Sequence, residues 1–156
     1  MAFWLLKTEP NTFSWQDLVA SPNRSTCWEG VRNYQARNIM RDEMKIGDRV
    51  FIYHSVVKPM VIAGVAEVVR EAYPDHFAWD PESPYFDAKS SPENPRWVMV
   101  DVRAEYGFDP PITRDELKDV PELAGMMLLQ KGSRLSVQPV SQKEWATVLS
   151  LRESNG

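Results

Sequence analysis

The chain of 156 residues has few of the side chains that metal, disulfide and phosphate-cradle chemistry requires. Its only cysteine is Cys27 and its only histidines are His54 and His76, which excludes an intrachain disulfide and a zinc site of the cysteine type. It has seven glycines and contains neither a Gly-x-Gly-x-x-Gly motif nor a P-loop, so the usual phosphate cradles are absent. We therefore expect no metal and no bound cofactor.

Long hydrophobic runs are also missing. No apolar stretch approaches the roughly 20 residues of a membrane span, and the short run 2–6 is followed at once by the polar segment 7–10 instead of a signal-peptide core. A hydrophobic content of 43% and a charged content of 26% are typical of a globular chain, and the length suits one domain, which we predict to span 1–156. We expect a monomeric, cytoplasmic protein that does not bind membranes.

The chain has no overall positive charge. Its formal net charge is −4, from 18 Lys and Arg against 22 Asp and Glu. The acidity is confined to the middle, because residues 71–130 carry five basic and thirteen acidic groups, whereas residues 1–70 and 131–156 each have a net charge of +2. Without a broad basic surface to contact phosphates, any nucleic-acid binding is expected to be local and pocket-driven, with weak non-specific affinity.

Apolar periodicity and capping residues predict about five strands interrupted by short helices, and therefore an α+β fold with a small, strongly bent sheet or pseudo-barrel. Strands are predicted at residues 3–8, 49–55, 61–69, 97–102 and 135–139. Helices are predicted after Ser14, over 31–44 and 113–118, and after Ser141. Thr113 and Glu116 have the spacing of a capping box.

The segment 71–95 joins two of these strands and combines five prolines with several acidic and aromatic residues. It is too long and too aromatic for a simple connector, so we expect an ordered excursion over the surface. Its acidic, proline-rich composition is compatible with solvated loops and with a docking site for a partner protein.

Aromatic residues are plentiful, with six Trp, six Phe and five Tyr, and most are expected to fill the core. Trp28 differs, because it lies between loop residues and the start of a predicted helix, where an indole can face a cleft and stack on a planar ligand. Asn33, Arg37, Arg41 and Lys45 recur every four residues and form either a solvated helix face or a basic ridge. A stacking tryptophan just before a basic ridge suits a protein that holds a base and its phosphates.

Several motifs, in order along the chain, carry a resemblance to a known family. They are the heptamer 4–10 (WLLKTEP), the undecamer 28–38 (WEGVRNYQARN), and the shorter segments 53–55, 73–75, 94–97 and 134–140. With them the chain resembles the EVE domain family from Phe3 to about Leu151. The resemblance implies a PUA-like pseudo-barrel of about five to six strands with peripheral short helices, related to the YTH domains that read N6-methyladenine.

The resemblance also implies a pocket for a modified base. A base flipped from its strand would stack on Trp28 and be held at its edge by backbone amides and short polar side chains. A second wall would come from Trp79 or Trp97. From the basic ridge, independently of the resemblance, we predict that Arg32, Arg37 and Arg41 lie near the phosphates. The base-binding residues would be Lys7, Thr8, Glu9, Trp28, Asn33, Tyr53, His54, Ser55, Arg134, Ser136, Gln138 and Pro139.

The predicted function is non-enzymatic recognition of modified bases in DNA or RNA. Two alternatives stay open at this point. PUA-like folds also accompany enzymes that modify nucleic acids, so an accessory or catalytic role in base modification is one, and a protein-interaction module is the other. An acid–base pair that converges on the pocket would favour the enzyme, whereas a pocket lined by aromatic rings and amides would favour the reader.

Overall fold

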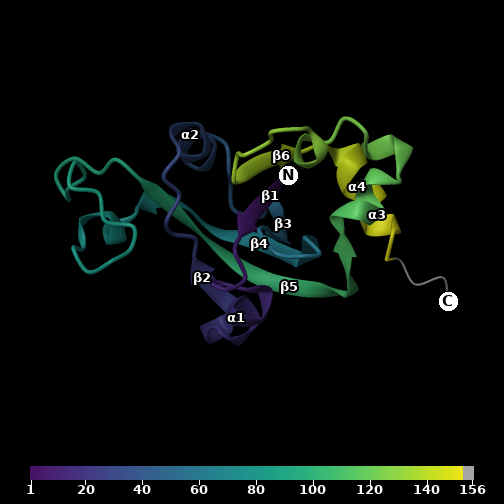
Figure 1. Cartoon of the computed structure of the whole chain (residues 1–156). Coiled ribbons are helices and arrows are strands. Elements are labelled where there is room, and N and C mark those ends of the chain that lie inside the picture. The colour runs from purple at the N-terminus through teal and green to yellow at the C-terminus, as the bar shows by residue number, and fades with distance from the viewer. Residues whose placement is uncertain (153–156) are drawn as a thin grey trace.

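The computed structural model describes residues 1–152 and has an α+β fold built on one six-stranded sheet (Figure 1). The strand order is β2-β5-β4-β3-β1-β6, in which β1 and β3 are parallel and all other neighbours are antiparallel. The sheet is open, with β2 and β6 at its edges, and is compatible with a pseudo-barrel. The strands are β1 (Phe3–Thr8), β2 (Ser25–Cys27), β3 (Arg49–His54), β4 (Val61–Pro74), β5 (Val98–Thr113) and β6 (Val137–Val140).

Short helices connect the strands, and side-chain caps begin them where the sequence indicated. Ser14, Thr113 and Ser141 each form a capping box, in which the cap side chain and the third helical residue accept each other's backbone amides. The α-helices are α1 (Trp15–Ala20), α2 (Tyr34–Asp42), α3 (Arg114–Lys118) and α4 (Gln142–Ser150). Short 3₁₀ helices cover Pro22–Arg24, His76–Trp79, Pro121–Leu123 and Met127–Leu129. Within residues 1–152, none of the helices has the length and apolar character that crossing a bilayer requires.

Helix α2 is shorter than the predicted helix over 31–44. It begins at Tyr34 because Asn33 is its cap, with the Asn33 side chain accepting the Ala36 amide at 2.9 Å. The preceding residues, from Trp28 to Arg32, lie outside any helix and line a cleft.

Alternation along the central strands places two hydrophobic cores on opposite faces of the sheet. In β3, Val50 and Ile52 pack into the first core, whereas Phe51 and Tyr53 pack into the second. Helices α1 and α2 cover the first core, and α3 and α4 cover the second. Both faces of β1 and β3 are therefore buried.

Strand β5 continues well beyond the predicted strand 97–102 and includes Pro110 and Pro111, for which the sequence predicts a turn before a helix. The register explains how the strand tolerates them. Ile62 of β4 pairs with Ile112, but Gly64 pairs with Gly107, so the prolines lie in a bulge opposite a single residue of β4. Because residues in the bulge do not donate to the ladder, the missing proline N–H groups cost nothing there.

The predicted excursion over 71–95 begins later than expected, after β4 ends at Pro74, and extends away from the sheet beyond α2 (Figure 1). Its base is closed by the Asp75 amide, which donates to Trp97 O at 2.9 Å. Farther out, Asp87 accepts the Trp97 indole N–H at 2.7 Å. The excursion is thus ordered by its own hydrogen bonds and held in one position beside α2.

Candidate functional site

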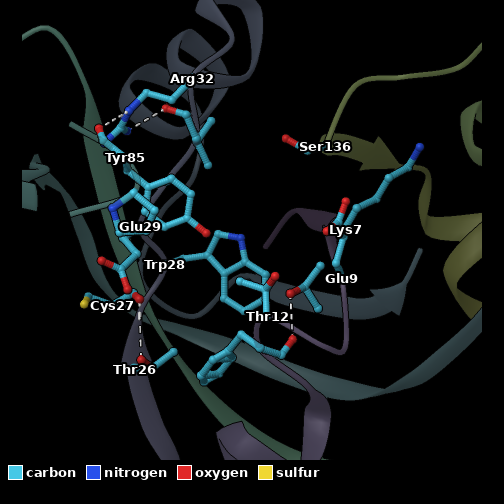
Figure 2. A pocket seen from close by; sticks show the side chains of 15 residues that line it. Lys7, Glu9, Thr12, Thr26, Cys27, Trp28, Glu29, Arg32, Tyr85 and Ser136 are labelled. Carbon is cyan, nitrogen blue, oxygen red and sulfur yellow. Dashed lines mark hydrogen bonds between the residues drawn. The ribbon is translucent and has the colours of Figure 1, made fainter. Parts of the chain in front are cut away.

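The described residues enclose a half-open cleft of about 510 Å³ (Figure 2). Three segments form most of it: the end of β1 with the loop that follows, the stretch between β2 and α2, and the tip of the excursion. The lining residues are Lys7, Thr8, Glu9, Thr12, Phe13, Thr26, Cys27, Trp28, Glu29, Gly30, Val31, Arg32, Pro84, Tyr85 and Ser136.

The end of β1 forms one side of the cleft and is fixed by hydrogen bonds to two loops. The Lys7 amide donates to Ser136 O at 2.9 Å, and Lys7 Nζ donates to Ser133 O at 3.1 Å. Thr8 Oγ1 donates to Phe13 O at 2.6 Å. Burial lowers the pKa of the Lys7 ammonium, and the positive charge of Arg114 lowers it further. This side of the cleft is therefore polar and rigid.

Trp28 lies at the centre of the lining residues (Figure 2). Its amide donates to Val100 O at 2.7 Å, which anchors the chain to β5. Phe13 meets the indole edge-on, with ring centroids 6.1 Å apart. The residue is only 8% exposed, so most of the indole belongs to the first core and a small part of its surface faces the cleft.

Tyr85, from the tip of the excursion, provides a second aromatic wall. Its ring covers Gly30, and its phenol extends toward the indole of Trp28 (Figure 2). Gly30 has φ of +82°, and a Cβ added there would lie 2.7 Å from the Tyr85 ring. Glycine is therefore required at this position for both its backbone conformation and the close approach of the ring.

A buried ion pair holds the excursion against the cleft. Asp75 is fully buried and accepts the Gly30 amide and Arg32 Nη1, each at 3.0 Å. Arg32 also donates to Tyr85 O from Nε at 3.0 Å and from Nη2 at 2.7 Å. The Asp75 carboxylate thus holds the segment that follows Trp28, and through Arg32 it also holds the Tyr85 backbone at the tip of the excursion.

Two titratable side chains of the lining have pKa values shifted upward. Burial raises the pKa of the Glu29 carboxyl, and the nearby Asp75 carboxylate raises it further, while His76 and Arg32 oppose the shift. Burial likewise raises the pKa of the Cys27 thiol, helped by the charge of Glu29. The thiol is therefore a weaker nucleophile than an exposed cysteine.

The structure brings part of the predicted site together. Of the predicted residues, the cleft is lined by Lys7, Thr8, Glu9, Trp28, Arg32 and Ser136. Outside the lining lie four other predicted base-binding residues, namely Asn33, Arg134, Gln138 and Pro139. Asn33 caps α2, and Gln138 is buried and donates to Ser133 Oγ and Leu135 O, which shapes the loop beside Lys7. Arg134 and Pro139 are both exposed.

The predicted residues at the end of β3 also lie behind the cleft. Tyr53 points into the second core, on the face of the sheet opposite Trp28, because side chains alternate along the strand. His54 accepts the Trp15 amide with Nε2 at 3.0 Å, and burial lowers the pKa of its imidazole, in keeping with a neutral ring. The Ser55 amide donates to Thr8 O at 2.9 Å. These residues support the cleft without lining it.

The second aromatic wall of the cleft is formed by Tyr85, and not by Trp79 or Trp97 as predicted. Trp97 is buried, stacks on Tyr34 with centroids 4.8 Å apart, and neither it nor Trp79 lines the cleft. Sequence reasoning missed Tyr85 and the Gly30 contact beneath it. The available signals were Gly30, two residues after Trp28, and Asp75 of the Tyr-Pro-Asp segment at 73–75, which accepts the Gly30 amide.

The three arginines predicted to contact phosphates differ in the partners that their side chains already have within the protein. Arg32 is committed to Asp75 and Tyr85 O. Arg37 donates to Asn38 Oδ1 and to Arg96 O. Arg41 is exposed and pairs with its neighbour Asp42. Within residues 1–152, no cluster of three or more His, Cys, Asp or Glu side chains is placed to hold a metal ion.

The fold and cleft define a small α+β protein of PUA-like architecture, with an aromatic cleft at the ends of β1 and β2. The chain belongs to the EVE domain family, whose model matches residues 2–151. Thymocyte nuclear protein 1 of Gallus gallus is 45% identical over 167 residues, covering 96% of this chain and 68% of the relative.

Solved structures are similar over nearly the whole chain. The human THYN1 protein, crystallised in complex with 5-methylcytosine containing DNA, is 41% identical and covers 100% of both chains with a TM-score of 0.92. A protein from Pseudomonas syringae is 44% identical, covers 97% of this chain and 100% of its own, and has a TM-score of 0.92. The recognition of the family from sequence motifs is thereby confirmed.

Proposed function

We propose that this protein binds DNA that carries 5-methylcytosine, and that it acts as a reader that leaves the base unchanged. The observation that carries the proposal is the human relative solved with 5-methylcytosine containing DNA, which matches this chain over its full length. The cleft of about 510 Å³ has a size suited to a nucleobase with part of its sugar, because ligand pockets typically measure roughly 300–1,000 Å³.

In this proposal the base enters between the aromatic side and the polar side of the cleft. Trp28 and Tyr85 supply ring surface, and Lys7, Thr8 and Ser136 supply polar groups for the base edge. A buried 5-methyl group adds an apolar contact worth about 0.8 kcal/mol, which corresponds to roughly a fourfold gain in affinity. The preference for the methylated base is therefore expected to be real but modest.

The phosphates are assigned to Arg37 and Arg41, because Arg32 is held by the fully buried Asp75. The Arg41–Asp42 pair is exposed to solvent, and Arg37 donates to neutral acceptors. Two phosphate contacts on a single strand give a slope of about −1.4 in log affinity against log salt concentration. Such a shallow dependence fits a chain with a net charge of −4.

The non-enzymatic role is supported by the state of the reactive groups near the cleft. Burial raises the pKa of the Cys27 thiol, and the Nε2 lone pair of His54 is used by the Trp15 amide. Glu29 has a raised pKa but lies beside a carboxylate, Asp75, that is already saturated by Arg32 and the Gly30 amide. Asp75 is therefore not free to act as the paired base of an acid–base mechanism at Glu29.

The proposal is tested with the wild-type protein and short single-stranded oligonucleotides that contain one central 5-methylcytosine or one cytosine, at two salt concentrations. We expect roughly fourfold tighter binding of the methylated DNA and an unchanged mass of the oligonucleotide after incubation. The affinity for RNA strands of the same sequence is compared with the affinity for DNA, which decides between the two nucleic acids. Equal affinity for both bases contradicts the reader, and a change in mass contradicts the non-enzymatic role.

Substituting Gly30 by alanine is expected to reduce the methylcytosine preference and to destabilise the fold by about 1–3 kcal/mol, because the new Cβ collides with the Tyr85 ring at a positive φ. Gly47→Ala is the matched control, since Gly47 has φ of +94° but a Cβ added there would meet no atom within 4 Å. Urea unfolding of both variants measures the loss of stability, and DNA titration measures the loss of the methylcytosine preference. A Gly30→Ala protein that behaves like Gly47→Ala contradicts the role of Tyr85 as a wall.

A further inference from the structure

We propose that Tyr34 is a second stacking platform, for a base that neighbours the one held in the cleft. This inference rests on the proposed function, because it extends the same binding surface along the strand. Tyr34 is the first residue of α2 and is 50% exposed. Among the aromatic side chains of the described residues, only Phe86 and Tyr106 are similarly exposed, each at 45%.

The Tyr34 ring has a rigid backing. It stacks on Trp97 with centroids 4.8 Å apart and an interplanar angle of 25°. Trp97 is only 5% exposed, and its indole N–H is fixed on Asp87 at 2.7 Å. The tyrosine ring is therefore presented to solvent on a preformed support, so a base that stacks on it need not order a mobile side chain.

Positive charge lies beside this ring. The Arg37 guanidinium carbon is 4.8 Å from the Tyr34 ring centroid. Its N–H groups donate to neutral acceptors, Asn38 Oδ1 and Arg96 O, and in residues 1–152 no carboxylate lies within ion-pair distance of it. An exposed aromatic ring next to a guanidinium that has no carboxylate in contact suits a ligand that is planar and anionic, which is the chemistry of a nucleotide.

The platform is continuous with the cleft. Arg32, which lines the cleft, lies 5.7 Å from the Tyr85 ring and 5.6 Å from the Trp97 ring, and Trp97 supports Tyr34. Only one residue separates Arg32 from Tyr34 in the sequence, so their Cα atoms are at most about 7 Å apart. Because a stacked strand advances about 3.4 Å per nucleotide, a base close to the one in the cleft can reach the ring.

The test is a cycle in which the protein and the flanking bases are both changed. A single-stranded DNA with one central 5-methylcytosine is compared with the same strand in which the flanking nucleotides are abasic, using wild type and Tyr34→Ala. We expect the flanking bases to strengthen wild-type binding roughly tenfold and the gain to vanish in Tyr34→Ala, whereas Tyr34→Phe keeps it. The preference for 5-methylcytosine over cytosine is expected to survive in all three proteins.

Tyr106→Ala is the matched control, because Tyr106 is 45% exposed but lies on β5 and outside the cleft. This control is expected to leave the gain from the flanking bases unchanged. If Tyr34→Ala keeps that gain while 5-methylcytosine is still preferred, the platform is overturned and the proposed function stands. If wild type has no preference for 5-methylcytosine, the proposed function itself fails, which is a distinct result. Thermal unfolding confirms that each variant is folded.

Discussion

Replacing Trp28 by alanine is expected to remove the preference for 5-methylcytosine and to weaken binding of the methylated single strand roughly fivefold to 150-fold. The range follows from the roughly 1–3 kcal/mol that stacking of a base on an aromatic side chain contributes by alanine substitution. The substitution removes the indole but keeps the amide that donates to Val100 O at 2.7 Å, so the chain next to the cleft stays anchored. Titration of labelled oligonucleotides with and without the methyl group measures both effects.

Folding must be separated from binding in this experiment, because Trp28 is 8% exposed and belongs to the first core. Truncating a buried tryptophan costs about 3–5 kcal/mol. Trp145 is the matched control: it is 7% exposed, stacks on Phe51 with centroids 3.9 Å apart, and lies in the second core. Trp145→Ala is expected to lose comparable stability and to keep the methylcytosine preference.

Trp28→Phe provides a gentler variant, since it keeps an aromatic ring and most of the buried apolar surface. We expect it to retain part of the preference that Trp28→Ala loses. All variants are compared at a temperature at which circular dichroism shows them folded. A folded Trp28→Ala protein that still prefers 5-methylcytosine would mean that the base is held elsewhere.

Features that depend on neighbours in the chain could be predicted from the sequence. The caps Ser14, Thr113 and Ser141 begin helices because a short polar side chain satisfies the free amides of the first turn, and this signal lies within four residues. Trp28 could likewise be identified as a cleft residue, because its position between a loop and a helix was visible in the sequence. The α+β class followed from the same local patterns.

Features that depend on distant contacts could not be predicted from spacing alone. Tyr85 reaches the cleft because Arg32 binds its carbonyl across 53 positions of the chain, and Asp75 meets the Gly30 amide across 45. No periodicity connects these segments. Pro110 and Pro111 suggested a turn, and only the register between β4 and β5 explains why they lie in a strand.

The error at Tyr53 is of another kind, because the sequence held the information. Tyr53 and His54 are consecutive residues of β3, so their side chains point to opposite faces of the sheet. Both could not line one cleft from within the strand. Transfer of a family motif as a block concealed this alternation, and the structure places Tyr53 in the second core.

Removing the Asp75 carboxylate is expected to lower the free energy of unfolding by about 3–5 kcal/mol, as is typical when one partner of a buried ion pair is lost. Asp75 is fully buried and accepts the Gly30 amide, the Phe77 amide and Arg32 Nη1, each at 3.0 Å. In Asp75→Ala these three donors lose the carboxylate, Arg32 Nη1 keeps only Val31 O, and the Arg32 side chain, 22% exposed, keeps a poorly solvated charge. Urea unfolding of wild type and variant measures the loss.

The effects of substituting Arg32 and Asp75 on the free energy of unfolding are also expected to be coupled. In Arg32→Ala, which has already lost the guanidinium, Asp75→Ala is expected to cost less than in wild type, because no unpaired positive charge is left behind. Asp115→Ala is the matched control, since Asp115 is 91% exposed and pairs with Lys118 at the surface, where such pairs contribute about 0–1 kcal/mol. An Asp75→Ala protein as stable as Asp115→Ala would show that the pair does not hold the excursion, and the wall formed by Tyr85 would then need another anchor.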